Sequence, residues 1–181
     1  MDDEVPPDQV TGYLASFEPT MRLALEVATA GPAEDVPVGA VVLAADGSIL
    51  GRGRNQCIVA SDPTAHAEIV ALREAARAAS FWRLDGCTLV VTLEPCTMCA
   101  GALVAARIAR LVYGATDPRA GAVGSLWDVV RDRRLGRPVE VLGGVLAREC
   151  GELVSAFFAR LRQDAGNDPG TGGATPGEAL G

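Results

Sequence analysis

Lysine is missing from this chain of 181 residues, histidine occurs once, and aromatic residues make up only 4% of it. No apolar run approaches the roughly 20 residues that a membrane-spanning helix needs. The N-terminus, Met1-Asp2-Asp3-Glu4, is acidic where a secretory signal is basic and then apolar. Five cysteines, an odd number with two in a C-x-x-C spacing, do not suggest a disulfide framework. We therefore expect a cytoplasmic protein without a membrane segment.

The composition that remains is typical of one globular domain. Hydrophobic residues make up 49% of the chain and charged residues 22%, which is enough to bury a sizeable core. We expect a single folded domain at residues 17–163. The polar, proline-bearing residues 1–16 and the Gly-, Pro- and Asp-rich residues 164–181 are expected to be disordered.

Basic charge is concentrated in one part of the chain. The net charge is −7, yet residues 107–162 hold ten arginines and six acidic residues, a local charge of +4. Such a region can attract a polyanion such as RNA although the whole chain is acidic. The use of arginine alone suits bidentate contacts with phosphate, but a GC-rich coding sequence explains the same bias. The arginine bias by itself decides nothing.

Hydrophobic periodicity and turn residues predict helices and strands in alternation, beginning with a helix and a β-hairpin. This order implies an α/β fold, a three-layer α/β/α sandwich around a mixed five-stranded sheet. The predicted helices are 19–30, 64–79, 96–106, 126–134 and 147–162, and the predicted strands are 38–44, 49–54, 87–93, 110–114 and 139–142.

The only histidine, His66, and the C-x-x-C pair, Cys96 and Cys99, have the residue types of a metal site. Imidazole and thiolate suit zinc, and a catalytic zinc site uses three protein ligands so that the fourth position holds water. The cysteines lie in the first turn of a predicted helix, where backbone N–H groups favour the thiolate. His66 falls in the first turn of its own helix, with Asp62 or Thr64 as the expected N-cap. Two helix N-termini are therefore expected to meet at one Zn²⁺ ion.

Glu68 completes the pattern H-x-E followed by P-C-x-x-C, which is typical of zinc-dependent nucleobase deaminases. Zinc lowers the pKa of bound water from about 15.7 towards 7. Glu68 would take the water proton, pass it to the ring nitrogen beside the amino-bearing carbon, and help ammonia to leave. A structural zinc site would instead need a fourth protein ligand, for which Cys57, Cys87 and Cys150 are candidates. The pattern predicts hydrolytic deamination without an organic cofactor.

Four stretches carry a closer resemblance: residues 36–40 (VPVGA), 62–68 (DPTAHAE), 92–102 (TLEPCTMCAGA) and 121–126 (GAVGSL). They resemble the bacterial tRNA-specific adenosine deaminases of the cytidine-deaminase-like superfamily, and the similarity runs over residues 19–162. The resemblance implies a hydrolase, a homodimer that converts adenosine to inosine at wobble position 34 of a tRNA anticodon loop. It assigns zinc binding to His66, Cys96 and Cys99, and proton transfer to Glu68.

The resemblance also implies four substrate contacts. Asn55 matches the asparagine that contacts the target nucleoside, Val36 would line the base pocket, and Asp117 and Arg119 match positions that touch the anticodon loop. If these residues do not contact substrate, Asn55 is a loop asparagine, Val36 a core valine, and Asp117 and Arg119 are ordinary charged residues of a turn.

One segment departs from the family pattern. Where the family usually reads Leu-Asn-His-Arg, this chain reads Leu135-Gly136-Arg137-Pro138. Either Arg137 replaces the lost polar contacts, or tRNA binding is weaker, or the substrate has changed. We expect Arg137, Arg160 and Arg162 to lie near the mouth of the site as an RNA-binding rim. Two other functions stay open: a deaminase of free guanine, cytosine or nucleosides, and a non-enzymatic, zinc-stabilised dimer module.

Overall fold

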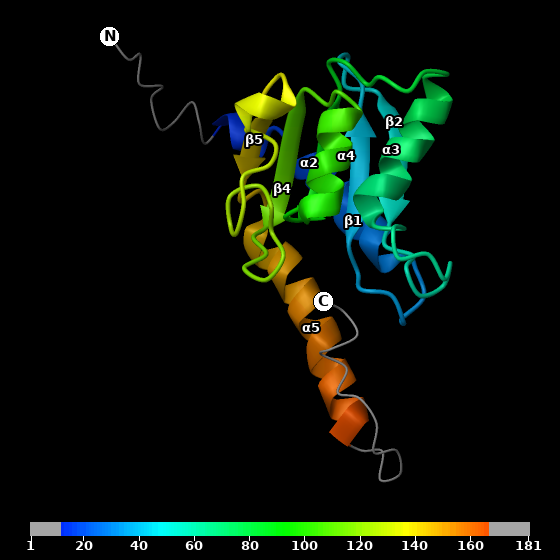
Figure 1. The fold of residues 1–181 in the computed structure, drawn as a ribbon. Helices are drawn as coiled ribbons and strands as arrows, with labels where there is room; N and C mark the ends of the chain where they lie inside the picture. The colour runs from blue at the N-terminus through cyan, green and yellow to red at the C-terminus, as the bar shows by residue number, and fades with distance from the viewer. Residues whose placement is uncertain (1–11, 167–181) are drawn as a thin grey trace.

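The computed structural model describes residues 12–166 and contains one mixed five-stranded sheet covered by helices on both faces (Figure 1). The strand order is β2-β1-β3-β4-β5; β1 is antiparallel to β2 and β3, and β3, β4 and β5 are parallel. The predicted fold class is confirmed. The elements are α2 (Glu18–Thr29), β1 (Gly39–Leu43), β2 (Ile49–Arg54), α3 (Ala67–Ala78), β3 (Thr88–Leu93), α4 (Thr97–Ala105), β4 (Arg110–Ala115), the 3₁₀ turn η1 (Arg133–Leu135), β5 (Glu140–Gly143) and α5 (Ala147–Gly166).

The sheet divides the hydrophobic core into two layers because successive side chains of a strand point to opposite faces. Ala40, Val42, Leu89 and Val91 pack with α3 and α4 on one face. The alternate strand residues, such as Val41, pack with α2 and the start of α5 on the other. Continuous apolar strands such as β3 are therefore buried on both sides.

The topology brings the first turns of α3 and α4 together. Strands β2 and β3 run in the same direction because both are antiparallel to β1, which lies between them. Helix α3 follows β2 and α4 follows β3, so both helices begin at the carboxyl ends of these strands. Glycines allow α3 to lie directly on β2, since a Cβ at Gly53 would be 2.2 Å from the Ala67 carbonyl oxygen.

The predicted helix at residues 126–134 is wrong. Its backbone instead bonds to the preceding loop, with Leu126 N–H donating to Gly121 O and Val129 N–H to Ala122 O. These tertiary bonds, together with the burial of Val130, hold the segment as turns that end in η1.

Two boundaries also differ from the predicted ones. Residues 12–15 are helical, and Leu14 packs against the core layer that α2 covers. Helix α5 continues to Gly166, beyond the predicted end at residue 162. The remaining residues expected to be disordered, 1–11 and 167–181, lie outside the described residues. Within 12–166, no helix has the length and apolar character needed to cross a membrane.

Candidate metal centre and active site

His66 and the two cysteines lie at the beginnings of neighbouring helices. His66 directly precedes α3 and Cys96 directly precedes α4, both with extended backbone, and Cys99 follows in the first turn of α4. The predicted meeting of two helix N-termini is therefore confirmed. The predicted N-cap of α3 is wrong, because His66 itself occupies that position. The Asp62 carboxylate closes the preceding turn by accepting from Thr64 N–H (2.8 Å) and from its hydroxyl (2.7 Å).

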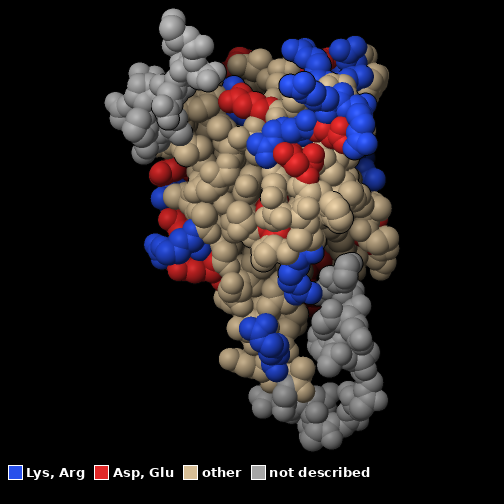
Figure 2. All heavy atoms as spheres, turned by 60° about the vertical axis from the view of Figure 1, so that its left-hand side comes forward, with Lys and Arg blue, Asp and Glu red and all other residues tan. Residues whose placement is uncertain are grey.

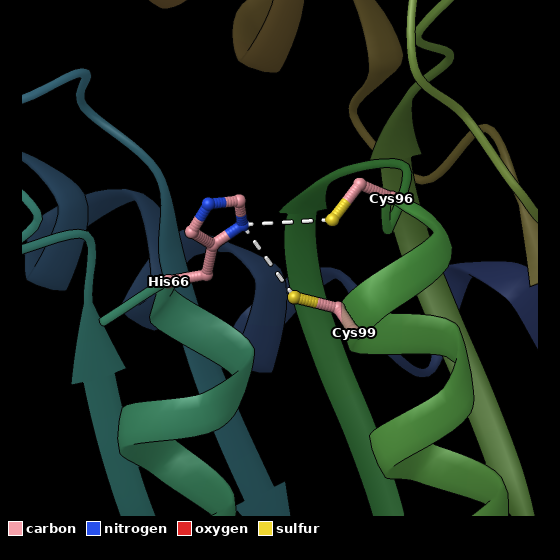
Figure 3. A group of neighbouring side chains, drawn as sticks. All are labelled: His66, Cys96 and Cys99. Carbon is pink, nitrogen blue, oxygen red and sulfur yellow. Dashed lines mark hydrogen bonds between the residues drawn. The ribbon is translucent and has the colours of Figure 1, made fainter. Parts of the chain in front are cut away.

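The three side chains converge with the geometry of a zinc site (Figure 3). His66 Nδ1 lies 3.7 Å from Cys96 Sγ and 3.6 Å from Cys99 Sγ. Tetrahedral zinc, with bonds of about 2.3 Å to sulfur and 2.0–2.1 Å to nitrogen, holds such ligand atoms roughly 3.6 Å apart. Both the donor set and the spacing fit, and the three residues form the site of one Zn²⁺ per chain.

A purely structural zinc site is not supported. Among residues 12–166 the metal-type cluster contains only His66, Cys96 and Cys99. Of the other candidates, Cys150 lies in α5 with its sulfur against Gly114 of β4, and Cys87 precedes β3 at the opposite end of that strand. The Cys57 thiol is bonded to Asn55 Oδ1 and is not part of the cluster. Three protein ligands leave the fourth zinc position for water, as catalytic zinc requires.

The pKa values of the two cysteine thiols are shifted in opposite directions. A hydrogen bond from the Cys99 thiol, with a further contribution from His66, lowers the pKa of Cys96 to about 4. The same contact, together with burial, raises the pKa of Cys99. Two thiolates this close repel each other, and a cation bound between the sulfurs would stabilise both. A zinc ion supplies that charge.

Glu68 is the acid in the first turn of α3 and is only 4% exposed. Burial raises the pKa of its carboxyl, which the nearby charge of His66 opposes. The carboxyl belongs to the first turn of the helix that begins after His66, and it is not part of the ligand cluster. A buried carboxyl beside a metal site is suited to accept and return a proton.

Glu94, which the motif analysis did not single out, connects the strand before Cys96 to a distant loop. Its carboxylate accepts from the backbone N–H groups of Asp117 (3.0 Å), Val123 (3.1 Å) and Ser125 (3.0 Å), and from the Ser125 hydroxyl. Burial alone would raise the pKa of Glu94, but these hydrogen bonds outweigh it and lower the pKa. The sequence signal for Glu94 was its position as an acidic residue directly after an apolar strand.

Gly121 is required by this arrangement. A Cβ there would lie 2.5 Å from Glu94 Cδ and 2.5 Å from the Asp117 carbonyl oxygen. Any side chain at this position would displace the carboxylate from its four donors. The loop of residues 117–125 is thereby fixed beside the zinc ligands.

Asp35, which sequence reasoning did not identify, holds the loop after β2, from which the chain leads to His66. Its buried carboxylate accepts from the backbone N–H of Ile58 at 2.7 Å and lies 3.9 Å from the Arg54 guanidinium. The segment before β1 is thus tied to the loop after β2. Val36, the next residue, is half-buried and packs against the core layer of α3 and α4.

Asn55 follows β2 and is half-buried, and its backbone N–H donates to Val38 O at 2.9 Å. Its Oδ1 accepts from the Cys57 thiol at 3.2 Å. Among residues 12–166 no protein group accepts from its side-chain N–H₂, which is therefore free to donate to a ligand. Cys57 thus touches the predicted nucleoside contact, which its sequence position alone did not establish.

Asp117 and Arg119 lie in the loop held by Glu94. Asp117 Oδ1 accepts from the backbone N–H groups of Arg119 (2.9 Å) and Ala120 (3.3 Å), so its carboxylate shapes the turn. The Arg119 side chain is exposed, and within residues 12–166 it forms no ion pair. The two residues are placed together, with Arg119 as the more accessible.

The predicted arginine rim is divided between two places. Arg160 and Arg162 lie on α5, and Arg160 Nη2 donates to Ala33 O at 2.5 Å, in the segment that leads to Asp35 and Val36. Arg137 instead precedes β5 at its amino end, whereas the zinc ligands follow the carboxyl end of β3. Since β3 and β5 run in the same direction, the expected position of Arg137 at the mouth is wrong.

The fold and the site define a zinc-dependent deaminase of the cytidine-deaminase-like class. The sequence profile of the cytidine and deoxycytidylate deaminase zinc-binding region matches residues 15–115. The tRNA-specific adenosine deaminase of Haemophilus influenzae is 49% identical over 148 residues, covering 81% of this chain and 86% of the relative. The chain belongs to the family of tRNA-specific adenosine deaminases.

Solved structures agree with this assignment. One, from work on A-to-I editing by tRNA:A34 deaminases at the wobble position of transfer RNA, has a TM-score of 0.70 and 44% identity, covering 74% of this chain and 96% of the other. The guanine deaminase from Nitrosomonas europaea has a TM-score of 0.66 at 26% identity, covering 88% of this chain and 96% of the other. The fold is common to both, and the sequence is closer to the tRNA enzyme.

Proposed function

We propose that this protein is a hydrolytic deaminase that converts adenosine to inosine at wobble position 34 of a tRNA. The observation that carries the proposal is the three-ligand zinc geometry with the buried Glu68 beside it, in a chain 49% identical to a tRNA-specific adenosine deaminase. Adenosine and water are consumed, and inosine and ammonia are released. The free-base alternative has weaker support, since identity to the guanine deaminase from Nitrosomonas europaea is 26%.

The chain's own groups move the protons. Zinc held by His66, Cys96 and Cys99 supplies the Lewis acidity that makes water a nucleophile at neutral pH. The Glu68 carboxylate accepts the proton that this water loses and delivers it to the ring nitrogen beside the amino-bearing carbon. The water oxygen bonds to the amino-bearing carbon, and Glu68 then accepts the second proton from this hydroxyl and gives it to the amine. The carbon–nitrogen bond breaks, ammonia leaves, and the hydroxyl becomes the carbonyl of inosine. Burial keeps the carboxyl away from bulk water during both transfers.

Four residues are proposed to hold the nucleotide. The free N–H₂ group of Asn55 donates to the target nucleoside, and Val36 forms apolar contact with the base. Arg119 contacts the anticodon loop, while Asp117 fixes the turn that presents it. Arg160 and Arg162, on α5, are proposed to meet RNA phosphates, since guanidinium groups bind phosphate in bidentate fashion.

We also propose a homodimer that acts in the cytoplasm, where its tRNA substrate is found. Segments that flank the zinc site expose large apolar side chains, which commonly mark protein interfaces. These are Ile58, Val59, Met98, Leu126 and Trp127. Light scattering coupled to gel filtration should give twice the chain mass, and a single-chain mass would refute the dimer.

The substrate is tested by comparing an anticodon stem-loop carrying adenosine 34 with free adenine, guanine, cytosine and adenosine. Inosine formed in the stem-loop and ammonia released from none of the free compounds is the expected result. A stem-loop with adenosine moved to position 35 is the matched control and should not react. Turnover of a free base with none on the stem-loop would refute the proposed function.

A further inference from the structure

A hollow lies at the end of the sheet opposite the zinc site. It has a volume of about 250 Å³ and opens beside the amino ends of β3, β4 and β5. Its apolar lining comes from Val104, Ile108 and Val139, and its charged lining from Asp85, Arg107 and Arg137. β3 spans six residues, so roughly 20 Å separates this hollow from the zinc ligands.

The hollow presents unbalanced positive charge. The single acid in its lining, Asp85, is already neutralised by Arg83, whose Nε and Nη2 donate to its two carboxylate oxygens at 2.9 and 3.2 Å. Arg107 and Arg137 have no acidic partner within residues 12–166. The Arg107 guanidinium lies beside Gly136, where a Cβ would be 3.5 Å from Nη1, so both arginines border the same loop.

We propose that this hollow is a phosphate-binding site, separate from the catalytic centre. Two unpaired guanidinium groups at the edge of one hollow are suited to a phosphate group, because each offers paired N–H donors to its oxygens. In a chain of net charge −7 without lysine, two arginines free of acidic partners in one hollow form a local attraction for an anion.

The phosphate can come from RNA or from a free phosphorylated compound, and the surroundings favour RNA. Basic side chains gather over the end of the molecule away from α5, with some acidic side chains between them (Figure 2). Arg133, whose carbonyl accepts from the Gly136 N–H, is exposed and unpaired within residues 12–166 and adds to this charge. An extended basic surface matches a polyanion better than a single phosphate.

Exposed aromatic side chains border the same end. Phe81 is 55% and Trp82 61% exposed, in the loop that leads to Asp85. The Arg83 guanidinium, which holds Asp85, also lies 5.9 Å from the centroid of the Trp82 ring. Aromatic and arginine side chains together are the groups on which unpaired bases stack. The RNA source rests on the proposed function; the phosphate site itself does not.

The test removes both arginines and leaves the catalytic centre intact. Arg107→Gln/Arg137→Gln is compared with Arg52→Gln/Arg77→Gln, which removes two exposed arginines of β2 and α3 that form no ion pair within residues 12–166. Affinity for whole tRNA is measured between 50 and 300 mM salt. Binding of pyrophosphate to each protein is measured by calorimetry.

For the Arg107 and Arg137 variant, we expect the slope of log Kd for tRNA against log salt to fall by about 1 to 2 relative to the control. Turnover of saturating anticodon stem-loop should not change. An unchanged tRNA affinity with loss of pyrophosphate binding would assign the site to a free phosphorylated compound. If both ligands bind the two variants equally, the phosphate site is refuted. Failure of the wild type to deaminate the stem-loop would instead refute the proposed function.

Discussion

The two ends of the central sheet are built from opposite kinds of charged group. At the carboxyl ends of β2 and β3, the acids Asp35, Glu68 and Glu94 are buried. At the amino ends of β3–β5, Arg107 and Arg137 face a hollow without acidic partners in the described residues. Proton transfer requires fixed positions, whereas attraction of a phosphate requires mainly charge and reach. Substitutions at the first end should therefore alter catalysis or stability, and those at the second end only salt-dependent affinity.

The largest expected effect at the carboxyl end is that of Glu68→Ala. Because the carboxylate moves protons and is not a zinc ligand, the variant should retain one zinc per chain and lose about 10²- to 10⁴-fold in kcat on the stem-loop. Zinc is measured by atomic emission and kcat by inosine formation. The exposed Glu26→Ala is the control and should match the wild type.

Loss of zinc from Glu68→Ala would show that Glu68 is a ligand or a structural residue. Full activity of the variant would show that the buried Glu68 is not needed for catalysis, and the proposed difference between the two ends of the sheet would no longer hold. A kcat loss of similar size in the Arg107 and Arg137 variant would also contradict the comparison, because it would show that the amino end of the sheet contributes to catalysis.

The sequence predicts ligands more readily than the groups that hold them in place. His66, Cys96 and Cys99 could be found because zinc accepts few residue types at a narrow range of spacings. Glu94 could be noticed only as an acid at the end of an apolar strand. Its role could not be predicted, because its partners are largely backbone N–H groups 23 to 31 residues away, and backbone donors leave no mark in a sequence.

Two errors of the sequence analysis have different physical origins. Residues 126–134 have helical apolar spacing, but hydrogen bonds to residues 121 and 122 override local propensity. The position of Arg137 was readable: it stands just before a strand, and a parallel crossover returns the chain to the amino end of the sheet.

An intermediate effect is expected for Glu94→Gln. Each carboxylate oxygen accepts from two donors. An amide N–H₂ in place of Oε1 would face two backbone N–H donors, and in place of Oε2 it would face one, because the Ser125 hydroxyl can turn to accept. Leaving buried N–H groups unsatisfied should lower the free energy of unfolding by about 2–3 kcal/mol. Urea denaturation of the zinc-loaded protein measures it.

Ser125→Ala is the graded control, because it removes only the hydroxyl among the four donors to Glu94. Its expected cost is about 1 kcal/mol. Equal stability of Glu94→Gln and the wild type would mean that the loop of residues 117–125 is held by other contacts, and that a buried acid at this end is as dispensable as an exposed arginine at the other.

The smallest expected effect is that of Cys57, whose thiol donates to Asn55 Oδ1 and so fixes which way the amide faces. Cys57→Ala should raise KM for the stem-loop about two- to fivefold with little change in kcat, since one net hydrogen bond contributes about 0.5–1.5 kcal/mol and a thiol is a weak donor. Cys57→Ser keeps a donor and should restore KM. If the serine and alanine variants have the same KM, Cys57 only fills space, because a positioning role requires the donor rather than the volume.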